Sequence, residues 1–187
     1  MCGRYGFSID IEEVRKLVQE VERLERVEVK TEEIFPTNRV PILLPGGSGG
    51  TPAAAAWGFP NPYRKGTIIN ARAETVGEKW MFRSLLVGGR CIVPTTGFYE
   101  WDPEKKKYRF GLPGESMLYL AGLWSSYEGE RQFVILTAAA NESVAGIHDR
   151  MPVVLTEEGR EKWLHDPLRA AELLRIVPPL LAKEAAS

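Results

Sequence analysis

A cysteine stands at position 2 of this chain, in the opening stretch MCGRYGF. If Met1 is removed, Cys2 becomes the first residue and carries a free α-amine and a thiol on neighbouring carbons. An internal cysteine offers only the thiol, so this terminus would hold a pair of nucleophiles. The position of Cys2 therefore predicts nucleophilic chemistry, provided that other side chains can move protons beside it.

Three further polar side chains stand among apolar residues. His148 lies in GIHDRMPVVL, before a predicted strand; imidazole exchanges protons near neutral pH, and a satisfied surface histidine is the equal alternative. Glu100 in TTGFYEW has aromatic neighbours that can raise a carboxyl pKa, although a lone carboxylate on a strand usually faces solvent. Asn70 in IINARAET has the amide to hold a carbonyl or hydroxyl group, or to serve only in a turn.

Other kinds of site fit the sequence poorly. Cys2 and Cys91 are far apart, as are the two histidines, and they match no metal-ligand spacing, so we expect no metal and no cofactor. The stretch PGGSGG lacks the Lys-Ser/Thr ending of a phosphate-binding loop, and no GxSxG nucleophile elbow is present. His165 falls at the end of a predicted helix, where the helix dipole favours a structural role.

The candidate residues Cys2, Asn70, Glu100 and His148 must be positioned by strands with helices on either side in the sequence. Apolar residues at helical spacing predict a helix over residues 11–24, with Ser8 or Asp10 as its cap, and a second helix is expected around 78–86, with Trp80 in the core. β-branched, aromatic or small apolar runs predict strands, which we expect to form antiparallel hairpins after residue 90. These strands cover residues 40–44, 53–59, 66–69, 90–94, 97–101, 107–112, 116–124, 131–139 and 152–155.

The C-terminal part is predicted to hold two short helices. Thr156 caps the first, which runs to Trp163, and Asp166 with Pro167 opens the second. The sequence VPPLLAKEAAS stops that helix, so we expect a domain over residues 1–176 and a C-terminal tail over 177–187. Helices that bracket antiparallel strands predict a single-domain α+β fold with a curled, barrel-like β core flanked by helices.

Composition and charge restrict the class of protein. Hydrophobic residues make up 44% of the chain and charged residues 26%, which suits a folded domain with a substantial core. The 24 basic and 25 acidic residues give a net charge of -1, so nucleic acid would need a local basic surface. Two isolated cysteines are no disulfide framework, and neither a signal peptide nor a membrane-length apolar run is seen. We therefore expect a cytoplasmic protein, without a membrane, that acts as a monomer.

Five strings in order carry a resemblance to a known family. MCGRY, INARAET, MFRSLL, RCIVPTTGFYEW and IHDRMPVVL resemble the SOS response-associated peptidase (SRAP) family of abasic site processing proteins, from Cys2 to about Leu155. The resemblance implies the α+β domain described above and a basic cleft for single-stranded DNA that contains abasic sites.

The resemblance also assigns roles to residues of this chain. Cys2 would be the nucleophile, and Asn70, Glu100 and His148 would be the catalytic amide, carboxylate and histidine of their motifs. The residues expected to meet DNA or shape its pocket are Arg4, Pro36, Trp57, Arg72, Arg83 and Arg150. Arg90 is a further candidate for phosphate, and Trp57, Phe59 and Trp80 are candidates for base stacking, with core packing favoured for Trp80. Glu33 and Phe35 stand where the family often has Asn and Ala, and an acid there would repel a DNA backbone.

In the family, the N-terminal cysteine traps the open aldehyde of an abasic sugar as a thiazolidine. The α-amine forms a Schiff base and the thiol closes a five-membered ring, an attack that is effectively intramolecular. The Schiff base also permits β-elimination of the 3′ phosphate, which implies lyase side activity, and the family name suggests autocatalytic cleavage of Met1. Two alternatives stay open: a thiol peptidase acting on other proteins, with His148 as base, and a non-enzymatic binder of single-stranded DNA.

Overall fold

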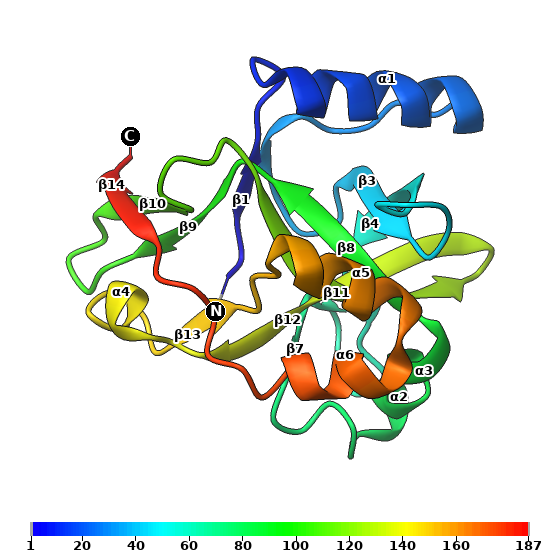
Figure 1. Ribbon diagram of the computed structural model, residues 1–187. Coiled ribbons are helices and arrows are strands. Elements are labelled where there is room, and N and C mark those ends of the chain that lie inside the picture. The colour runs from blue at the N-terminus through cyan, green and yellow to red at the C-terminus, as the bar shows by residue number, and fades with distance from the viewer. Residues whose placement is uncertain (1, 187) are drawn as a thin grey trace.

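The computed structural model describes residues 2–186, and Figure 1 shows their arrangement. Met1, whose removal the sequence predicts, lies outside the described residues. In chain order the elements are β1 (Tyr5–Phe7), α1 (Glu12–Glu25), β2 (Glu32–Ile34), β3 (Arg39–Leu44), β4 (Thr51–Trp57), β5 (Phe59–Pro60), β6 (Thr67–Ile68), β7 (Asn70–Arg72), α2 (Trp80–Arg83), α3 (Leu85–Gly88), β8 (Arg90–Thr95), β9 (Gly97–Trp101), β10 (Lys107–Gly111), β11 (Leu118–Tyr127), β12 (Glu130–Ala139), α4 (Glu142–Ala145), β13 (Arg150–Pro152), α5 (Glu157–His165), α6 (Pro167–Leu173) and β14 (Ala182–Ala185).

Five strands form a closed barrel. The larger sheet runs β11-β8-β3-β4-β12, and a further pairing of β11 with β12 closes the ring. The expected α+β class and barrel-like core are therefore confirmed. Most pairings are antiparallel as expected, but β12 runs parallel to β4 and to β7. The β7 pairing sets Asn70 opposite Ile135, which fixes the position of that amide on the barrel wall.

The N-terminal strand is inserted into the middle of a second sheet. Its order is β14-β10-β9-β1-β2, so β1 is hydrogen-bonded on both sides. Tyr5 lies opposite Ile34 of β2 and Phe98 of β9. Both neighbouring strands hold β1 in place, and Cys2, three residues before Tyr5, is fully buried. Cys2 therefore has a fixed position although it lies close to the N-terminus.

Alternation along the strands separates two apolar layers. Phe133 and Ile135 of β12 belong to the core that includes Cys2, whereas Val134 and Leu136 face the layer covered by α5 and α6. Successive strand residues point to opposite faces, so one strand serves both layers. Trp163 of α5 is fully buried in the second layer, where its Nε1 donates to the carbonyl of Cys91 at 2.8 Å. In Figure 1 the two helices lie across this side of the barrel.

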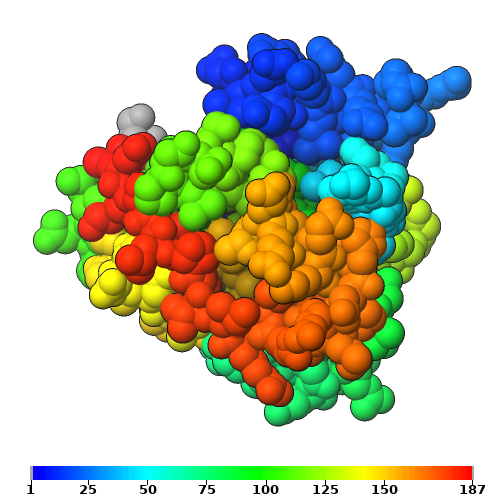
Figure 2. Space-filling view, viewed as in Figure 1, coloured from blue at the N-terminus to red at the C-terminus, as the bar shows by residue number. Residues whose placement is uncertain are grey.

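Helix α1 lies where the periodicity predicts it. Val14 and Val21 are buried, and Val21 packs against Ala54 of β4, whose alanines allow the helix to come close. Figure 2 shows the helix as a ridge along one end of the molecule. The predicted cap is wrong, because Ile11 occupies the N-cap position and no side chain caps the helix there.

The C-terminal helices begin as predicted. Thr156 accepts from the N–H of Gly159, and Asp166 accepts from the N–H groups of Leu168 and Arg169. These are the side-chain caps that free N–H groups of a first turn require.

Two other segments differ from expectation. The helix expected around 78–86 is two short helices, α2 and α3, and Trp80 lies on the surface. The expected tail contains β14, which pairs with β10. The chain before β14 is held by bonds from Asn141 Nδ2 to the Pro178 carbonyl (2.8 Å) and from the Leu181 N–H to Ser143 Oγ (3.1 Å).

Candidate active site

The side chain of Asn70 holds the backbone of the predicted nucleophile. Its Nδ2 donates to the carbonyl oxygen of Cys2 at 2.8 Å, across 68 residues of sequence. Asn70 opens β7, so the barrel wall fixes the donor. Its Oδ1 is buried and has no hydrogen-bond partner among the described residues, which leaves one acceptor available beside Cys2. Of the two uses considered for this amide, the structure shows the contact with the Cys2 backbone.

The thiol of Cys2 is buried. Its Sγ lies 3.6 Å from the carbonyl oxygen of Arg4. Burial raises the pKa of this thiol, and the negative charge of Glu100 raises it further. The protonated thiol therefore dominates at neutral pH, so attack by sulfur requires a neighbouring group that takes the proton.

Glu100 lies inside the protein rather than toward solvent. It projects from β9 and is 5% exposed. Burial raises the pKa of its carboxyl, while the nearby His148 opposes that shift. The charge of Glu100 acts on both Cys2 and His148. The structure thus brings together the four residues that the motifs predict as catalytic, from β7, β9, the N-terminus and the segment before β13.

His148 is oriented by the backbone of the following strand. Its Nδ1 accepts from the N–H of Arg150 at 2.9 Å, so a neutral ring carries its proton on Nε2. The exposed carboxylate of Asp149 lies 2.9 Å from the same Nδ1. The two contacts suit different protonation states: the neutral ring accepts from Arg150, and the charged ring would donate to Asp149. Both partners follow His148 directly in the chain, so either contact holds the ring beside the start of β13.

The guanidinium of Arg150 is engaged inside the protein. It forms a two-pronged ion pair with Glu74, at 2.6 and 2.8 Å, and donates to the Thr137 carbonyl at 2.6 Å. The hydrogen bond from Arg150 lowers the pKa of Glu74 to about 2. With 13% of its side chain exposed, Arg150 shapes the site and is not free for a DNA phosphate.

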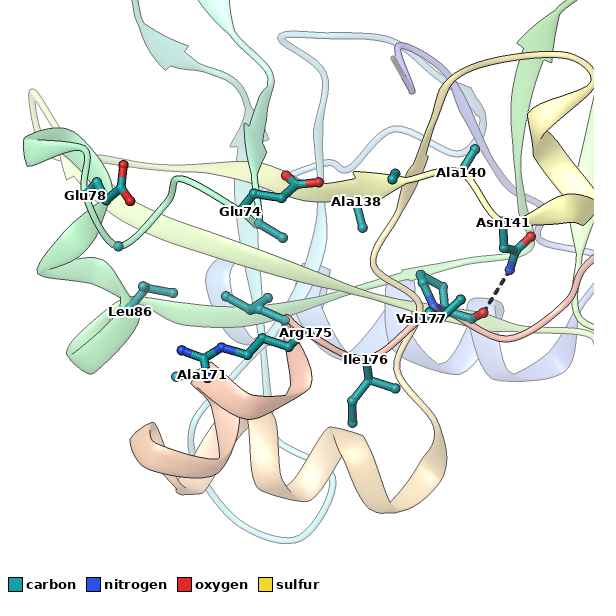
Figure 3. A pocket seen from close by; sticks show the side chains of 15 residues that line it. Glu74, Glu78, Leu86, Ala138, Ala140, Asn141, Ala171, Arg175, Ile176 and Val177 are labelled. Carbon is teal, nitrogen blue, oxygen red and sulfur yellow. Dashed lines mark hydrogen bonds between the residues drawn. The ribbon is translucent and has the colours of Figure 1, made fainter.

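Glu74 also forms part of a hollow on the other side of this ion pair. Figure 3 shows it above Ala171 and Arg175, in a hollow of about 540 Å³ between the end of β12 and the segment after α6. None of the four predicted catalytic residues lines it. The hollow therefore lies beside the ion pair, not at the nucleophile.

Arg4 is held in a cluster that includes Glu33, the acid that was expected to repel a DNA backbone. Its guanidinium lies 3.7 Å from the ring centre of Phe35 and 5.3 Å from that of Trp101, and its Nη1 is 3.1 Å from Glu33. Lys107 binds the same Glu33 oxygen at 2.8 Å. Glu33 is therefore neutralised by two cations in the protein without DNA. Pro36 follows in the adjoining turn and is partly exposed.

An open groove begins beside Asn70. Its volume is about 590 Å³, and its lining includes Asn70, Arg72, Lys79, Tyr63 and Trp80. The two aromatic rings are 79% and 62% exposed, respectively, and Trp80 Nε1 donates to Tyr63 Oη at 3.1 Å. The prediction of a core position for Trp80 was wrong. Sequence reasoning missed Tyr63 and Lys79, although an aromatic residue inside the polar loop NPYRKG was an available signal.

Several residues predicted to meet DNA lie elsewhere. Trp57 is fully buried, stacks on Phe133 and donates to the Ile69 carbonyl at 3.0 Å, so the expected DNA contact is corrected to a core role. Phe59 is also fully buried. Arg90 is 4% exposed and donates to main-chain carbonyls at the ends of α3 and α5, including Val87 at 2.7 Å. Its cation offsets the negative helix ends instead of meeting phosphate.

Arg83 and Arg72 remain exposed. Arg83 lies on α2, outside the groove lining, and Arg72 lies in it. Within residues 2–186, no group of three or more His, Cys, Asp and Glu side chains is placed to hold a metal ion. In the same part of the chain, the helices are too short and too polar for any of them to cross a lipid bilayer.

Comparison with known proteins finds relatives of this chain. Residues 1–186 match the family model described as SOS response associated peptidase (SRAP). The abasic site processing protein YoqW of Bacillus subtilis is 34% identical over 180 residues, which cover 88% of this chain and 80% of YoqW. YedK of Escherichia coli, also named an abasic site processing protein, is 29% identical, with 94% and 85% covered.

A crystal structure of a Bacteroides thetaiotaomicron protein has the same fold. Its TM-score is 0.80 at 24% identity, with coverage of 100% of this chain and 92% of the other. The match therefore spans every strand of the barrel. On these grounds, the chain belongs to the SRAP family.

Proposed function

We propose that this protein processes abasic sites in single-stranded DNA, and that Cys2 forms a thiazolidine crosslink with the lesion after Met1 is removed. One observation carries the proposal: Cys2, Asn70, Glu100 and His148 come together from separate parts of the chain around the one residue that can offer an amine and a thiol. The names of the relatives YoqW and YedK point to the same substrate.

The reaction begins at the aldehyde of the ring-opened sugar. The α-amine of Cys2 adds to the carbonyl carbon, and loss of water gives a Schiff base. The sulfur then bonds to the same carbon, and the thiol proton ends on the nitrogen, so that a five-membered ring closes with no other reactant. Because amine and thiol belong to one residue, the second step needs no further encounter.

The neighbouring residues have distinct parts in these steps. Asn70 holds the Cys2 backbone so that the amine and the sulfur keep one position. Glu100 holds its proton to higher pH than an ordinary carboxyl, so it can protonate the departing hydroxyl as a general acid. His148 moves a proton when the sugar ring opens. The buried thiol passes its proton through this acid–base pair, because it is itself a weak acid there.

Two side activities belong to the same proposal. The Schiff base acidifies the neighbouring C–H bond of the sugar, so β-elimination of the 3′ phosphate competes with ring closure. This competition would give strand cleavage as a lyase product. The Cys2 thiol would also attack the carbonyl carbon of Met1 and displace the Cys2 amine. Water then hydrolyses the resulting thioester, which releases methionine and leaves a free thiol and amine on Cys2.

The groove beside Asn70 suits the strand that carries the lesion. Single-stranded DNA is held by cations along its backbone and by aromatic faces on which bases stack. Arg72 and Lys79 supply charge in the groove, and Tyr63 and Trp80 supply exposed rings. Arg4, two residues after Cys2 in the chain, supplies a further positive charge.

A denaturing gel tests the proposal. Protein shown by intact mass to lack Met1 is incubated with an oligonucleotide that contains one abasic site, and with its undamaged twin. We expect a heat-stable adduct with the damaged strand alone. An unshifted damaged strand would refute the proposal, and equal non-covalent binding of both strands without an adduct would favour a simple binder.

The Cys2→Ala variant separates the two steps. If its methionine is removed, its amine still forms the Schiff base, but no thiol closes the ring. We expect the stable adduct to be lost and cleaved strand to increase on the same gel. Full retention of a heat-stable adduct by this variant would contradict the role of the thiol.

A further inference from the structure

Glu33 of β2 lies between two cations, Arg4 and Lys107. Its Oε1 accepts from Arg4 Nη1 at 3.1 Å and from Lys107 Nζ at 2.8 Å. Burial alone would raise the pKa of Glu33, but the hydrogen bonds from Lys107 and Arg4 outweigh it and lower that pKa. Glu33 is therefore ionised at neutral pH and cancels one of the two positive charges.

Each cation has a second support that does not cancel its charge. Arg4 lies over the rings of Phe35 and Trp101, and Lys107 Nζ lies 4.4 Å from the ring centre of Tyr99. Aromatic faces hold cations in place through the ring quadrupole and leave the net charge unchanged. The carboxylate is thus not needed to position Arg4 and Lys107, and its main effect is to reduce the charge they present.

The position of Glu33 allows its carboxylate to be replaced. It lies on β2, a three-residue strand at the edge of the five-stranded sheet, and 33% of its side chain is exposed. A DNA phosphate offers the same kind of anionic oxygen to Arg and Lys donors as a carboxylate does. A change of rotamer at Glu33 would break both ion pairs and leave Arg4 and Lys107 able to bind a phosphate, without any movement of the sheet.

We propose that Glu33 limits the affinity of the protein for single-stranded DNA, because it occupies Arg4 and Lys107 and must give way before phosphates can bind them. The inference rests on the proposed function, since it requires a strand that passes Arg4. It makes Glu33 an affinity-determining residue of this chain.

The test is the salt dependence of binding by Glu33→Gln. Glutamine keeps an oxygen acceptor for both donors and removes only the charge. Binding of an undamaged oligonucleotide is measured by fluorescence anisotropy at several salt concentrations, so that no adduct chemistry is involved. Each phosphate contact on a single strand contributes a slope of about −0.7 to log K against log salt.

We expect Glu33→Gln to bind roughly two- to fivefold more tightly at low salt, in keeping with the strength of exposed ion pairs. Its slope should be steeper by about 0.7 to 1.4, for one or two more contacts. An unchanged slope, or weaker binding, would overturn the inference. In the Lys107→Gln background the gain in slope should be no more than about 0.7, because only Arg4 is left for Glu33→Gln to release.

Glu130→Gln is the matched control. Glu130 also forms an ion pair with an arginine, Arg39, so the substitution removes the same charge from the same kind of pair. Glu130 lies on β12, five residues before Ile135, which is opposite Asn70. The control should leave the slope unchanged; an equal gain there would show a net-charge effect and overturn the inference. If Glu33→Gln does not fold, Lys107→Gln in the natural chain should leave the slope unchanged, because Glu33 already keeps Lys107 from phosphate there; a slope shallower by about 0.7 would overturn the inference.

The outcomes separate this inference from the proposed function. Adduct formation by Glu33→Gln on an abasic oligonucleotide, together with an unchanged slope, would refute the role of Glu33 alone. Loss of adducts in the natural protein, with strand binding retained, would refute the crosslinking chemistry alone. A lack of strand binding by both proteins would refute both.

Discussion

The backbone N–H of Arg150 donates to Nδ1 of His148 at 2.9 Å. This bond fixes the plane of the imidazole and assigns the proton of the neutral ring to Nε2. The side chain of the same Arg150 is anchored by Glu74 and by Thr137. An ion pair outside the four proposed catalytic residues therefore helps to fix the ring of His148 through one backbone bond.

Glu74→Gln should slow adduct formation without weakening DNA binding. The amide loses the charge that holds Arg150, so the N–H that orients His148 is less well fixed. Loss of such a charged hydrogen bond costs about 1.5–3 kcal/mol, and we expect at least a tenfold slower reaction with an altered pH–rate profile. Strand affinity should be unchanged because Arg150 is not free for phosphate. Glu172→Gln, which removes the same charge from an exposed ion pair with Arg169 on α6, is the control. A fall in the strand affinity of Glu74→Gln with an unaltered pH–rate profile would contradict the positioning role of Glu74.

Asn70→Ala should reduce the rate of crosslinking while the fold is kept. The change removes the bond to the Cys2 carbonyl, worth about 1 kcal/mol, so a roughly fivefold loss is expected. Asn70→Asp should be worse, because its carboxylate would face the Cys2 carbonyl and add negative charge near Glu100. Single-turnover rates on denaturing gels measure both variants. Equal rates for the alanine and aspartate variants would contradict the role of the amide as donor.

Glu100→Gln should stabilise the protein at neutral pH. Because the folded-state pKa of Glu100 is raised, its contribution to stability is present below the unfolded value of about 4.3 and is lost as pH rises through the folded value. Glutamine stays neutral, so the variant should have a higher free energy of unfolding than the natural chain at pH 8, and the gap should close near pH 4. Urea titrations across this range measure it. A variant less stable at pH 8 would show that the ionised carboxylate is favoured in the fold.

Two tryptophans should respond in opposite ways to alanine substitution. Trp80→Ala removes an exposed ring and should weaken strand binding by about 1–3 kcal/mol, with little change in stability. Trp57→Ala empties a fully buried site and should destabilise the fold by about 3–5 kcal/mol. Anisotropy and thermal unfolding of both variants provide the comparison. Normal affinity in Trp80→Ala would exclude that ring as a stacking platform.

Local pattern in the sequence determined much of this protein. The apolar spacing in residues 11–24 predicts α1, alternating and β-branched runs predict the barrel strands, and Thr156 and Asp166 mark helix starts. These features depend on neighbours within a few residues, which is why the sequence displays them. The order of the five motifs likewise predicts which polar residues meet.

The tertiary structure alone decided which charges and rings are free. Nothing near Arg150 in sequence shows that Glu74 binds it. The sequence favoured a core position for Trp80 and a DNA contact for Trp57, which is the reverse of their exposure in the structure. The strand β14 has no β-branched residue and forms because β10 offers an edge. Partners of this kind are distant in the chain, so spacing carries no record of them. The same holds for Glu33. From the sequence its charge is expected to repel a DNA backbone, and only the structure shows that Arg4 and Lys107 neutralise it.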